Sequence, residues 1–296
     1  DKQRILLAMA TGTGKTRLAT GLMYRLIKSQ RFKHILFLVD RSTLGTQAFD
    51  AFGAEVIEQG QTLAQIYTVA DLGVDTTERP EVQVATVQSL VHRLFNSDAP
   101  LPIDFYDCII IDEAHRIGAK SYQEIMEYFK PKFWLGMSAS PERTDDFDVY
   151  AAFDHNIAYE IRLQQALEES LLCPCHYFGI TDFLTNGNET DFTDFNYLTS
   201  NQRVDYIIEQ TNYYGYSGER VKGLMFCSSK KEAAALSERL NLRGYRTIAL
   251  SGEDSQEKRE DAIDRLVSDT RSDYLQYILT VDIFNEGVDI PEINQV

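Results

Sequence analysis

One stretch near the N-terminus, MATGTGKT at residues 9–16, limits the possible folds of this chain more than any other feature. It follows an apolar run at residues 5–8 that is typical of a buried strand. It precedes residues 17–27, where apolar side chains recur at helical spacing. A strand, a glycine-bearing turn and a helix that opens with Lys-Thr form the arrangement of a P-loop, whose backbone N–H groups surround a phosphate chain. The stretch therefore predicts a nucleotide-binding turn.

The residue types in this turn suit a phosphate ligand. Lys15 would reach the β- and γ-phosphate oxygens of ATP, and the Thr16 hydroxyl would hold Mg²⁺. The general pattern has a glycine six residues before the lysine, where this chain has Met9, so an ordinary strand-to-helix turn is the alternative. The predicted nucleotide-binding residues of the turn are Thr11, Gly12, Thr13, Gly14, Lys15 and Thr16. Glycine at two of these positions permits backbone angles that side chains disfavour.

Strand-like and helix-like stretches alternate along the rest of the chain, which predicts an α/β fold with doubly wound parallel sheets. The expected strands are residues 33–39, 81–85, 108–111, 133–137, 221–227, 247–250 and 277–281. The expected helices between them are residues 42–52, 87–95, 121–129, 230–242 and 256–267. Between about residues 163 and 203 this alternation is lost, and the sequence becomes polar and turn-rich. We therefore expect a first domain at residues 1–165, a linker at 166–203 and a second, incomplete domain at 204–296.

Composition limits the cellular setting and the partners. The longest apolar runs are too short to span a bilayer. Cys108 and Cys227 lie in apolar runs, and Cys173 and Cys175 lack the spacing of a zinc knuckle, so the four cysteines are expected to be buried free thiols in a reducing compartment. We expect a cytoplasmic protein with no membrane partner. The formal net charge is −16, from 29 basic and 45 acidic residues, which is unusual for a nucleic-acid binder. A local basic groove stays compatible with this charge, because fields act over about 10 Å at 0.1 M salt.

An acidic pair, Asp112-Glu113, follows the buried run at residues 108–111. Ligands of open α/β sheets bind at the carboxyl ends of the strands, so this pair is predicted to lie at the nucleotide. Asp112 would hold Mg²⁺, and Glu113 would orient or deprotonate the water that attacks the γ-phosphate. Surface acid is the alternative for such a pair taken alone.

Taken together, the motifs resemble those of superfamily 2 helicases, which have two RecA-like P-loop domains with parallel sheets flanked by helices. The resembling stretches are MATGTGKT, DEAH (112–115), ATVQSL (85–90), SAS (138–140), LMFCSS (224–229), LSGEDS (250–255) and TVDIFNEGVDIPEIN (280–294). FLVDRSTLGTQAF (37–49) resembles motif Ia as written in the motor subunits of type I and type III restriction enzymes. The resemblance implies a DNA helicase or translocase that depends on ATP and Mg²⁺. It also implies a larger protein with further domains or subunits that acts in restriction or in DNA repair. An RNA helicase and a nucleotide-gated switch that binds nucleic acid without processive movement are the alternatives.

The resemblance also implies roles for single residues. The catalytic residues would be Lys15, Asp112, Glu113 and His115, with Thr16 and Asp112 at the metal. Ser138 and Ser140, with His115, would couple the nucleotide to strand movement, although His115 alone also fits a packing role. Nucleic-acid contacts would come from Arg41, Thr86, Gln88, Ser228, Ser251 and Thr280. Gly287 and Asp289 would face the nucleotide, with a simple turn before Pro291 as the alternative.

Two family elements fall outside residues 1–296: the adenine-recognition segment before the P-loop and the arginines of motif VI. Arginine fingers contribute about 10³–10⁵ in the rate of phosphoryl transfer. We therefore expect these 296 residues to bind ATP–Mg²⁺ and to hydrolyse it poorly. The aromatic residues between 177 and 216 are irregularly spaced and have few basic neighbours, which favours packing over base stacking.

Overall fold

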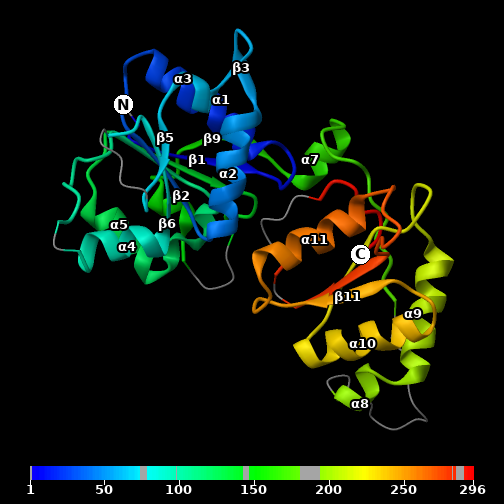
Figure 1. Ribbon diagram of the computed structural model, residues 1–296. Coiled ribbons are helices and arrows are strands. Elements are labelled where there is room, and N and C mark those ends of the chain that lie inside the picture. The colour runs from blue at the N-terminus through cyan, green and yellow to red at the C-terminus, as the bar shows by residue number, and fades with distance from the viewer. Residues whose placement is uncertain are drawn as a thin grey trace. The chain divides into compact units, whose positions relative to one another are not determined.

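The computed structural model describes residues 2–73, 79–97, 99–142, 147–180, 194–281, 283–284 and 290–296. The chain divides into two compact units, Asp1–His176 and Tyr177–Val296, each of which has its own sheet (Figure 1). The division falls inside the segment 166–203 that was expected to link two domains. The fold class predicted from the sequence, α/β with parallel sheets flanked by helices, is confirmed.

The first unit is built on a seven-stranded sheet in the order β5-β6-β2-β7-β8-β1-β9. All of its strand pairs are parallel. The strands are β1 (Arg4–Met9), β2 (Ile35–Val39), β5 (Val69–Asp71), β6 (Val82–Thr86), β7 (Cys108–Ile111), β8 (Phe133–Ser138) and β9 (Ile157–Ile161). A small antiparallel pair, β3 (Val56–Glu58) and β4 (Gln61–Thr62), lies outside this sheet.

Helices cover both faces of this sheet, which is why its inner strands read as continuous apolar runs. Along β2, Ile35, Phe37 and Val39 join one core and Leu36 and Leu38 the other. One core is completed by α1 (Lys15–Lys28), α2 (Ser42–Ala54), α3 (Leu63–Ile66) and α7 (Leu163–Glu168). The other is completed by α4 (Val87–Phe95), η1 (Ala114–Gly118), α5 (Lys120–Tyr128) and α6 (Val149–Ala152).

The second unit has a three-stranded parallel sheet in the order β10-β12-β11. Its strands are β10 (Gly223–Phe226), β11 (Thr247–Leu250) and β12 (Tyr277–Thr280), and its helices are α8 (Phe195–Leu198), α9 (Asn201–Tyr214), α10 (Lys230–Leu242) and α11 (Gln256–Val267). Side chains of α9 and α10 pack on one face of the sheet, and Ala262 and Leu266 of α11 pack on the other. No helix in the described parts of the chain has the length and apolar character needed to cross a membrane.

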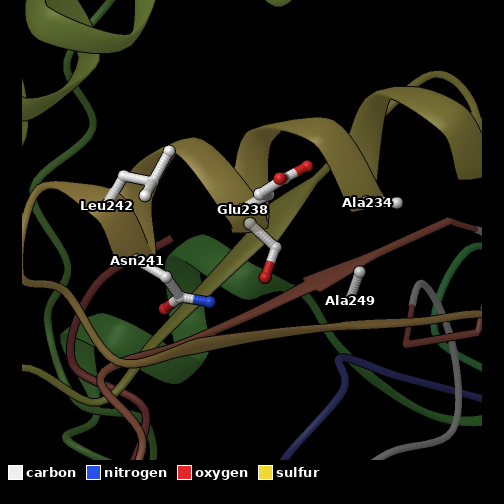
Figure 2. A pocket seen from close by; sticks show the side chains of 6 residues that line it. Ala234, Glu238, Asn241, Leu242 and Ala249 are labelled. Carbon is white, nitrogen blue, oxygen red and sulfur yellow. The ribbon is translucent and has the colours of Figure 1, made fainter.

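A surface pocket of the second unit lies between α10 and β11 (Figure 2). Its polar side chains hold the edge strand: the Thr247 N–H donates to Asn241 Oδ1 at 2.8 Å, and the hydroxyls of Ser237 and Thr247 are 2.8 Å apart. Leu242 is exposed at its rim. The polar groups of this pocket thus have a structural role in fixing β11.

The cysteine predictions are borne out only in part. Within the described residues the four thiols are free, and Cys108 is buried, as expected. Cys227 is half-buried, whereas Cys173 and Cys175 are exposed, so the expectation of buried thiols is wrong for this pair. The physical reason is that Cys173 and Cys175 belong to a segment without regular structure, residues 173–180, whose side chains are all exposed.

Candidate nucleotide-binding and catalytic site

The phosphate loop connects β1 to α1 at the carboxyl edge of the first sheet. Gly12 and Gly14 have φ angles of +80° and +89°, in the left-handed region that favours glycine. Both the N–H and the hydroxyl of Thr13 donate to the Ala10 carbonyl, at 3.3 and 2.6 Å, which closes the turn. Gly14 is the N-cap of α1 and has no side chain to cap it, so the first N–H groups of α1 are left available to an anion.

Lys15 is the first residue of α1, and its ammonium group lacks a hydrogen bond. Nζ is buried and has no hydrogen-bond partner among the described residues; Glu113 Oε1 lies 3.5 Å from it. A buried cation without hydrogen bonds is costly, and the cost is removed when an anion binds. The residues of this loop therefore fit the phosphates of a nucleotide.

The acidic pair follows β7, which is separated by β8 from β1, the strand that leads into the phosphate loop. β7 ends at Ile111 between β2 and β8, and the Asp112 N–H donates to the Leu38 carbonyl at 2.9 Å. Glu113 adopts φ 50° and ψ 48°, a left-handed conformation that is uncommon for a residue with a side chain. Backbone strain of this kind, of order 1–3 kcal/mol, is concentrated at functional sites. Here it directs the Glu113 carboxylate toward Lys15.

The two carboxylates have opposite pKa shifts. Burial, followed by the neighbouring Glu113 charge, raises the pKa of Asp112 to about 6, although Lys15 opposes this shift. Burial would also raise the pKa of Glu113, but hydrogen bonding to His115 and the charge of Lys15 outweigh it, so this pKa is lowered. A carboxylate that is costly to ionise is stabilised by a metal cation, and one that stays ionised is suited to accept a proton.

The described residues contain no cluster of three or more His, Cys, Asp or Glu side chains that could hold a metal by itself. Thr16 and Asp112 would supply two oxygen ligands at most. Mg²⁺ usually keeps several waters and binds through one or two carboxylates together with substrate phosphates. The donor set thus fits a magnesium ion that arrives with a nucleotide.

A chain of polar contacts leads from the acidic pair to the end of β8. His115 Nδ1 lies 3.3 Å from Glu113 Oε2 and 3.3 Å from the hydroxyl of Ser138. Ser138 is fully buried, and its Oγ accepts the Ser140 N–H at 3.2 Å. The structure therefore brings Lys15, the acidic pair and the three predicted coupling residues into one connected network.

The predicted nucleic-acid contacts of the first unit lie at one edge of its sheet. β2 and β6 end side by side, with Val39 paired to Thr86, so Arg41 and Gln88 follow neighbouring strands. Gln88 is exposed, and the Arg41 guanidinium contacts Asp40 at 3.4 Å. The hydroxyl of Thr86 caps α4 by accepting the Ser89 N–H at 3.1 Å. Their contact with nucleic acid stays a prediction.

The predicted nucleic-acid contacts of the second unit lie at the ends of its three strands, and two of their hydroxyls are hydrogen-bonded to nearby carboxylates. Ser228 donates its N–H and its hydroxyl to Glu232, both at 2.7 Å. Ser251 donates in the same way to Asp254, at 2.7 and 3.2 Å. Thr280 is fully buried, and its hydroxyl has no hydrogen-bond partner among the described residues. Gly287 and Asp289 lie outside the described residues.

Sequence reasoning missed an ion pair beside the site. Asp40 follows β2 at the same sheet edge as Asp112, and its Oδ2 lies 3.2 Å from Arg116 Nη1. The signal was present, since Asp40 directly follows a buried strand, as Asp112 does. It was hidden because Asp40 stands inside a stretch interpreted only as a nucleic-acid contact.

This fold and site define a P-loop nucleotide-binding protein with an Asp-Glu pair beside its phosphate loop. Residues 1–143 match the family model described as the type III restriction enzyme res subunit, and residues 202–296 match the helicase conserved C-terminal domain. The chain belongs to the superfamily 2 helicase cores, and subunits of restriction enzymes are among its relatives.

Two curated relatives cover almost the whole chain. The type I restriction enzyme EcoKI endonuclease subunit of Escherichia coli is 32% identical, over 99% of this chain and 29% of that protein. The putative ATP-dependent helicase IRC3 of Saccharomyces cerevisiae is 24% identical, over 99% of this chain and 43% of its own length. The chain thus spans less than half the length of these relatives.

Solved structures share the fold. The helicase domain of Pyrococcus furiosus Hef has a TM-score of 0.51 at 16% identity, covering 99% of this chain and 85% of its own. Saccharomyces cerevisiae Dbp5 bound to RNA and ADP BeF3 has a TM-score of 0.59 at 15% identity, covering 98% of this chain and 68% of its own. Both are two-domain helicase cores, which agrees with the two units of this chain.

Proposed function

We propose that this chain is the motor core of a DNA-dependent ATPase, which couples ATP hydrolysis to movement along DNA. The observation that carries the proposal is the buried Lys15 ammonium, which has no hydrogen-bond partner among the described residues and lies 3.5 Å from Glu113. A cation in this position is poised to bind phosphate, and the carboxylate beside it is poised to act on a water molecule.

Each residue of the site has a distinct part in the proposed reaction. Lys15 and the N–H groups of the phosphate loop bind and orient the phosphate chain. Bound Mg²⁺ would neutralise charge that develops on the phosphates, held by Asp112 and Thr16. Glu113, which is ionised at neutral pH, orients the attacking water or accepts its proton.

The network through His115 would report the state of the nucleotide to the nucleic-acid surface. Loss of the Glu113–His115 contact changes the partner available to Ser138, whose Oγ also holds the Ser140 backbone. A polar network with buried members has few alternative arrangements, so a change at one end is transmitted to the other. This supports coupling of the nucleotide to the nucleic-acid surface, which a motor and a nucleotide-gated switch both require.

The sequence of residues 37–49, which resembles motif Ia of restriction-enzyme motor subunits, favours DNA as the partner. A match of 27% identity over 38% of the chain to the ATP-dependent RNA helicase DBP3 of Saccharomyces cerevisiae supports the second candidate, an RNA helicase. ATP turnover measured with duplex DNA, single-stranded DNA and RNA of one sequence separates them. Stimulation by duplex DNA supports the proposal, and stimulation by RNA alone supports the alternative. Because residues 1–296 are expected to hydrolyse ATP poorly on their own, the assay uses them joined to a motif VI segment. No stimulation of that protein by any of the three would refute both.

A further inference from the structure

A leucine after α7 packs against the phosphate loop. The chain reverses at Ser170, which has a φ of 57°, and the N–H groups of Leu171 and Leu172 both donate to the Ala166 carbonyl, at 2.9 and 3.2 Å. This closure separates two neighbouring side chains: Leu171 is 53% exposed, whereas Leu172 turns inward and joins the core beneath α1.

Leu172 contacts the loop at Gly12. A Cβ atom at Gly12 would lie 2.9 Å from Leu172 Cδ2, closer than real side chains approach one another. A side chain at Gly12 would therefore displace the end of the Leu172 side chain. Gly12 also has a φ of +80°, which any other residue would adopt only with strain, so a glycine at this position serves both the loop and its contact with Leu172.

The helix that precedes Leu172, α7, is anchored on both sides. The Ile161 carbonyl, just before α7, accepts the Ala10 N–H at 2.9 Å, and Ala166 is fully buried in the same core. Arg162, the N-cap of α7, makes a two-bond contact with Glu142, at 2.5 and 2.8 Å. Because α7 is fixed, a movement of the phosphate loop acts on the chain after Ser170.

The segment after Ser170 leads directly into the second unit. Residues 173–180 have no regular structure and are all exposed, and the division between the units falls after His176. Leu172 is thus the last inward-facing side chain before this connecting segment.

We infer that Leu172 is a positioning residue through which the phosphate loop transmits its nucleotide state to residues 173–180. The inference rests on the proposed function, because it requires a nucleotide to bind the loop. Bound phosphates hold the loop's backbone N–H groups and fix Gly12 against Leu172, so the chain after Ser170 is held in one arrangement. Without phosphates the loop fluctuates, and Leu172 and the connecting segment fluctuate with it.

Two native thiols report on this segment. Cys173 and Cys175 are exposed, whereas burial raises the pKa of the Cys108 thiol and, with the Glu232 charge, raises that of Cys227 to about 12. Iodoacetamide alkylation followed by peptide mass spectrometry therefore measures the accessibility of Cys173 and Cys175 separately from the other two thiols.

The experiment compares alkylation rates with and without a non-hydrolysable ATP analogue and Mg²⁺. In the wild type we expect the nucleotide to change the alkylation rate of Cys173 by about threefold or more, because this thiol is exposed and its reactivity follows the arrangement of the segment that Leu172 holds. In Leu172→Ala the ratio is expected to fall to about one, because the contact that transmits the loop's state is gone. Leu171→Ala removes an exposed neighbour of the same size and should retain the wild-type ratio.

Binding of the ATP analogue is measured by fluorescence on the same samples. This measurement separates a failure of the inference on Leu172 from a failure of the proposed function. Binding to all three proteins, with the nucleotide-dependent change in Cys173 alkylation lost only in Leu172→Ala, supports the inference. Binding without such a change in the wild type overturns it and leaves the proposed function intact, and so does an undiminished change in Leu172→Ala. Failure of the wild type to bind the analogue overturns both. If Leu172→Ala does not fold, Leu172→Met and the wild type decide, since both are expected to show the change.

Discussion

Replacing Asp112 by Asn should make the nucleotide-free protein more stable, although it removes a metal ligand. Burial and the charge of Glu113 raise the pKa of Asp112 from 3.8 to about 6. Each pKa unit corresponds to about 1.4 kcal/mol, so an ionised Asp112 costs the folded protein roughly 3 kcal/mol at pH 7. The amide of Asn keeps the oxygen that accepts the Glu113 N–H at 3.0 Å. Allowing for burial of its NH₂ group, we expect a gain of about 2 kcal/mol.

The pH dependence provides a second test of the same reasoning. The folded state holds the Asp112 proton more tightly than the unfolded chain does. Its stability therefore falls as pH rises from about 4 to about 6, and the cost is fully present above that window. The advantage of Asp112→Asn should disappear below about pH 4, where the carboxyl is protonated in both states.

Asp107, at the other end of β7, is the matched control. Burial alone would raise its pKa, but hydrogen bonds from Lys132 and from the Lys33 and His34 N–H groups outweigh this and lower it. Asp107 thus stabilises the fold above its unfolded pKa, and the stabilisation is lost as pH falls through the folded value. Asp107→Asn should cost about 1–2 kcal/mol at pH 7.

Urea unfolding without nucleotide or Mg²⁺ measures both variants. Trp134 is the one tryptophan of the chain and is buried in β8, so its fluorescence reports on the first unit. A destabilised Asp112→Asn, or an advantage that persists below pH 4, would show that the Asp112 carboxylate is not held at an energetic cost.

Four further substitutions test other parts of the site and fold. Glu113→Gln should abolish ATP turnover and leave Mg²⁺–ATP binding within about twofold, since the proton acceptor is lost and the phosphate contacts stay; unaltered turnover would remove Glu113 from the mechanism. Ser138→Ala should leave nucleotide binding intact and reduce stimulation by nucleic acid by about tenfold, because His115 and the Ser140 N–H lose a buried partner; undiminished stimulation would contradict the proposed coupling. Gly136→Ala should destabilise the first unit by about 2–3 kcal/mol, because the new methyl would lie 2.3 Å from the Phe153 ring. Gly21→Ala in α1, where a Cβ has open space, should stabilise it by about 0.5–1 kcal/mol, and equal effects of the two would refute this packing argument.

The parts of the fold that the sequence predicts are those with strong physical signals. β1, β2, β7 and β8 are buried on both faces and read as apolar runs, and α10 and α11 occupy the residues expected for them. The edge strands were missed for a physical reason: β9 is exposed at four of its five residues, and β5 has three residues in all. Neither carries the continuous apolar run by which an inner strand is recognised.

The candidate site shows the same division. Lys15, Asp112 and Glu113 are predictable because phosphate and metal chemistry demands these residue types after particular strands. The left-handed backbone of Glu113, the contact of Asp40 with Arg116 and the packing of Leu172 on Gly12 depend on tertiary structure. Sequence patterns describe neighbours along the chain, whereas these contacts join segments that are distant in sequence. The burial of Thr280, a residue predicted to contact nucleic acid, likewise depends on tertiary structure.

The central claim is that the buried Lys15 ammonium is a phosphate site. Calorimetric titration of Mg²⁺–ATP into the wild type and into Lys15→Ala tests it most directly, with Lys28→Ala, an exposed lysine of the same helix, as the control. We expect the wild type and the control to bind alike and Lys15→Ala to bind at least about tenfold more weakly, because a charge-assisted hydrogen bond of roughly 1.5–3 kcal/mol is lost. Equal binding by all three proteins would contradict the account.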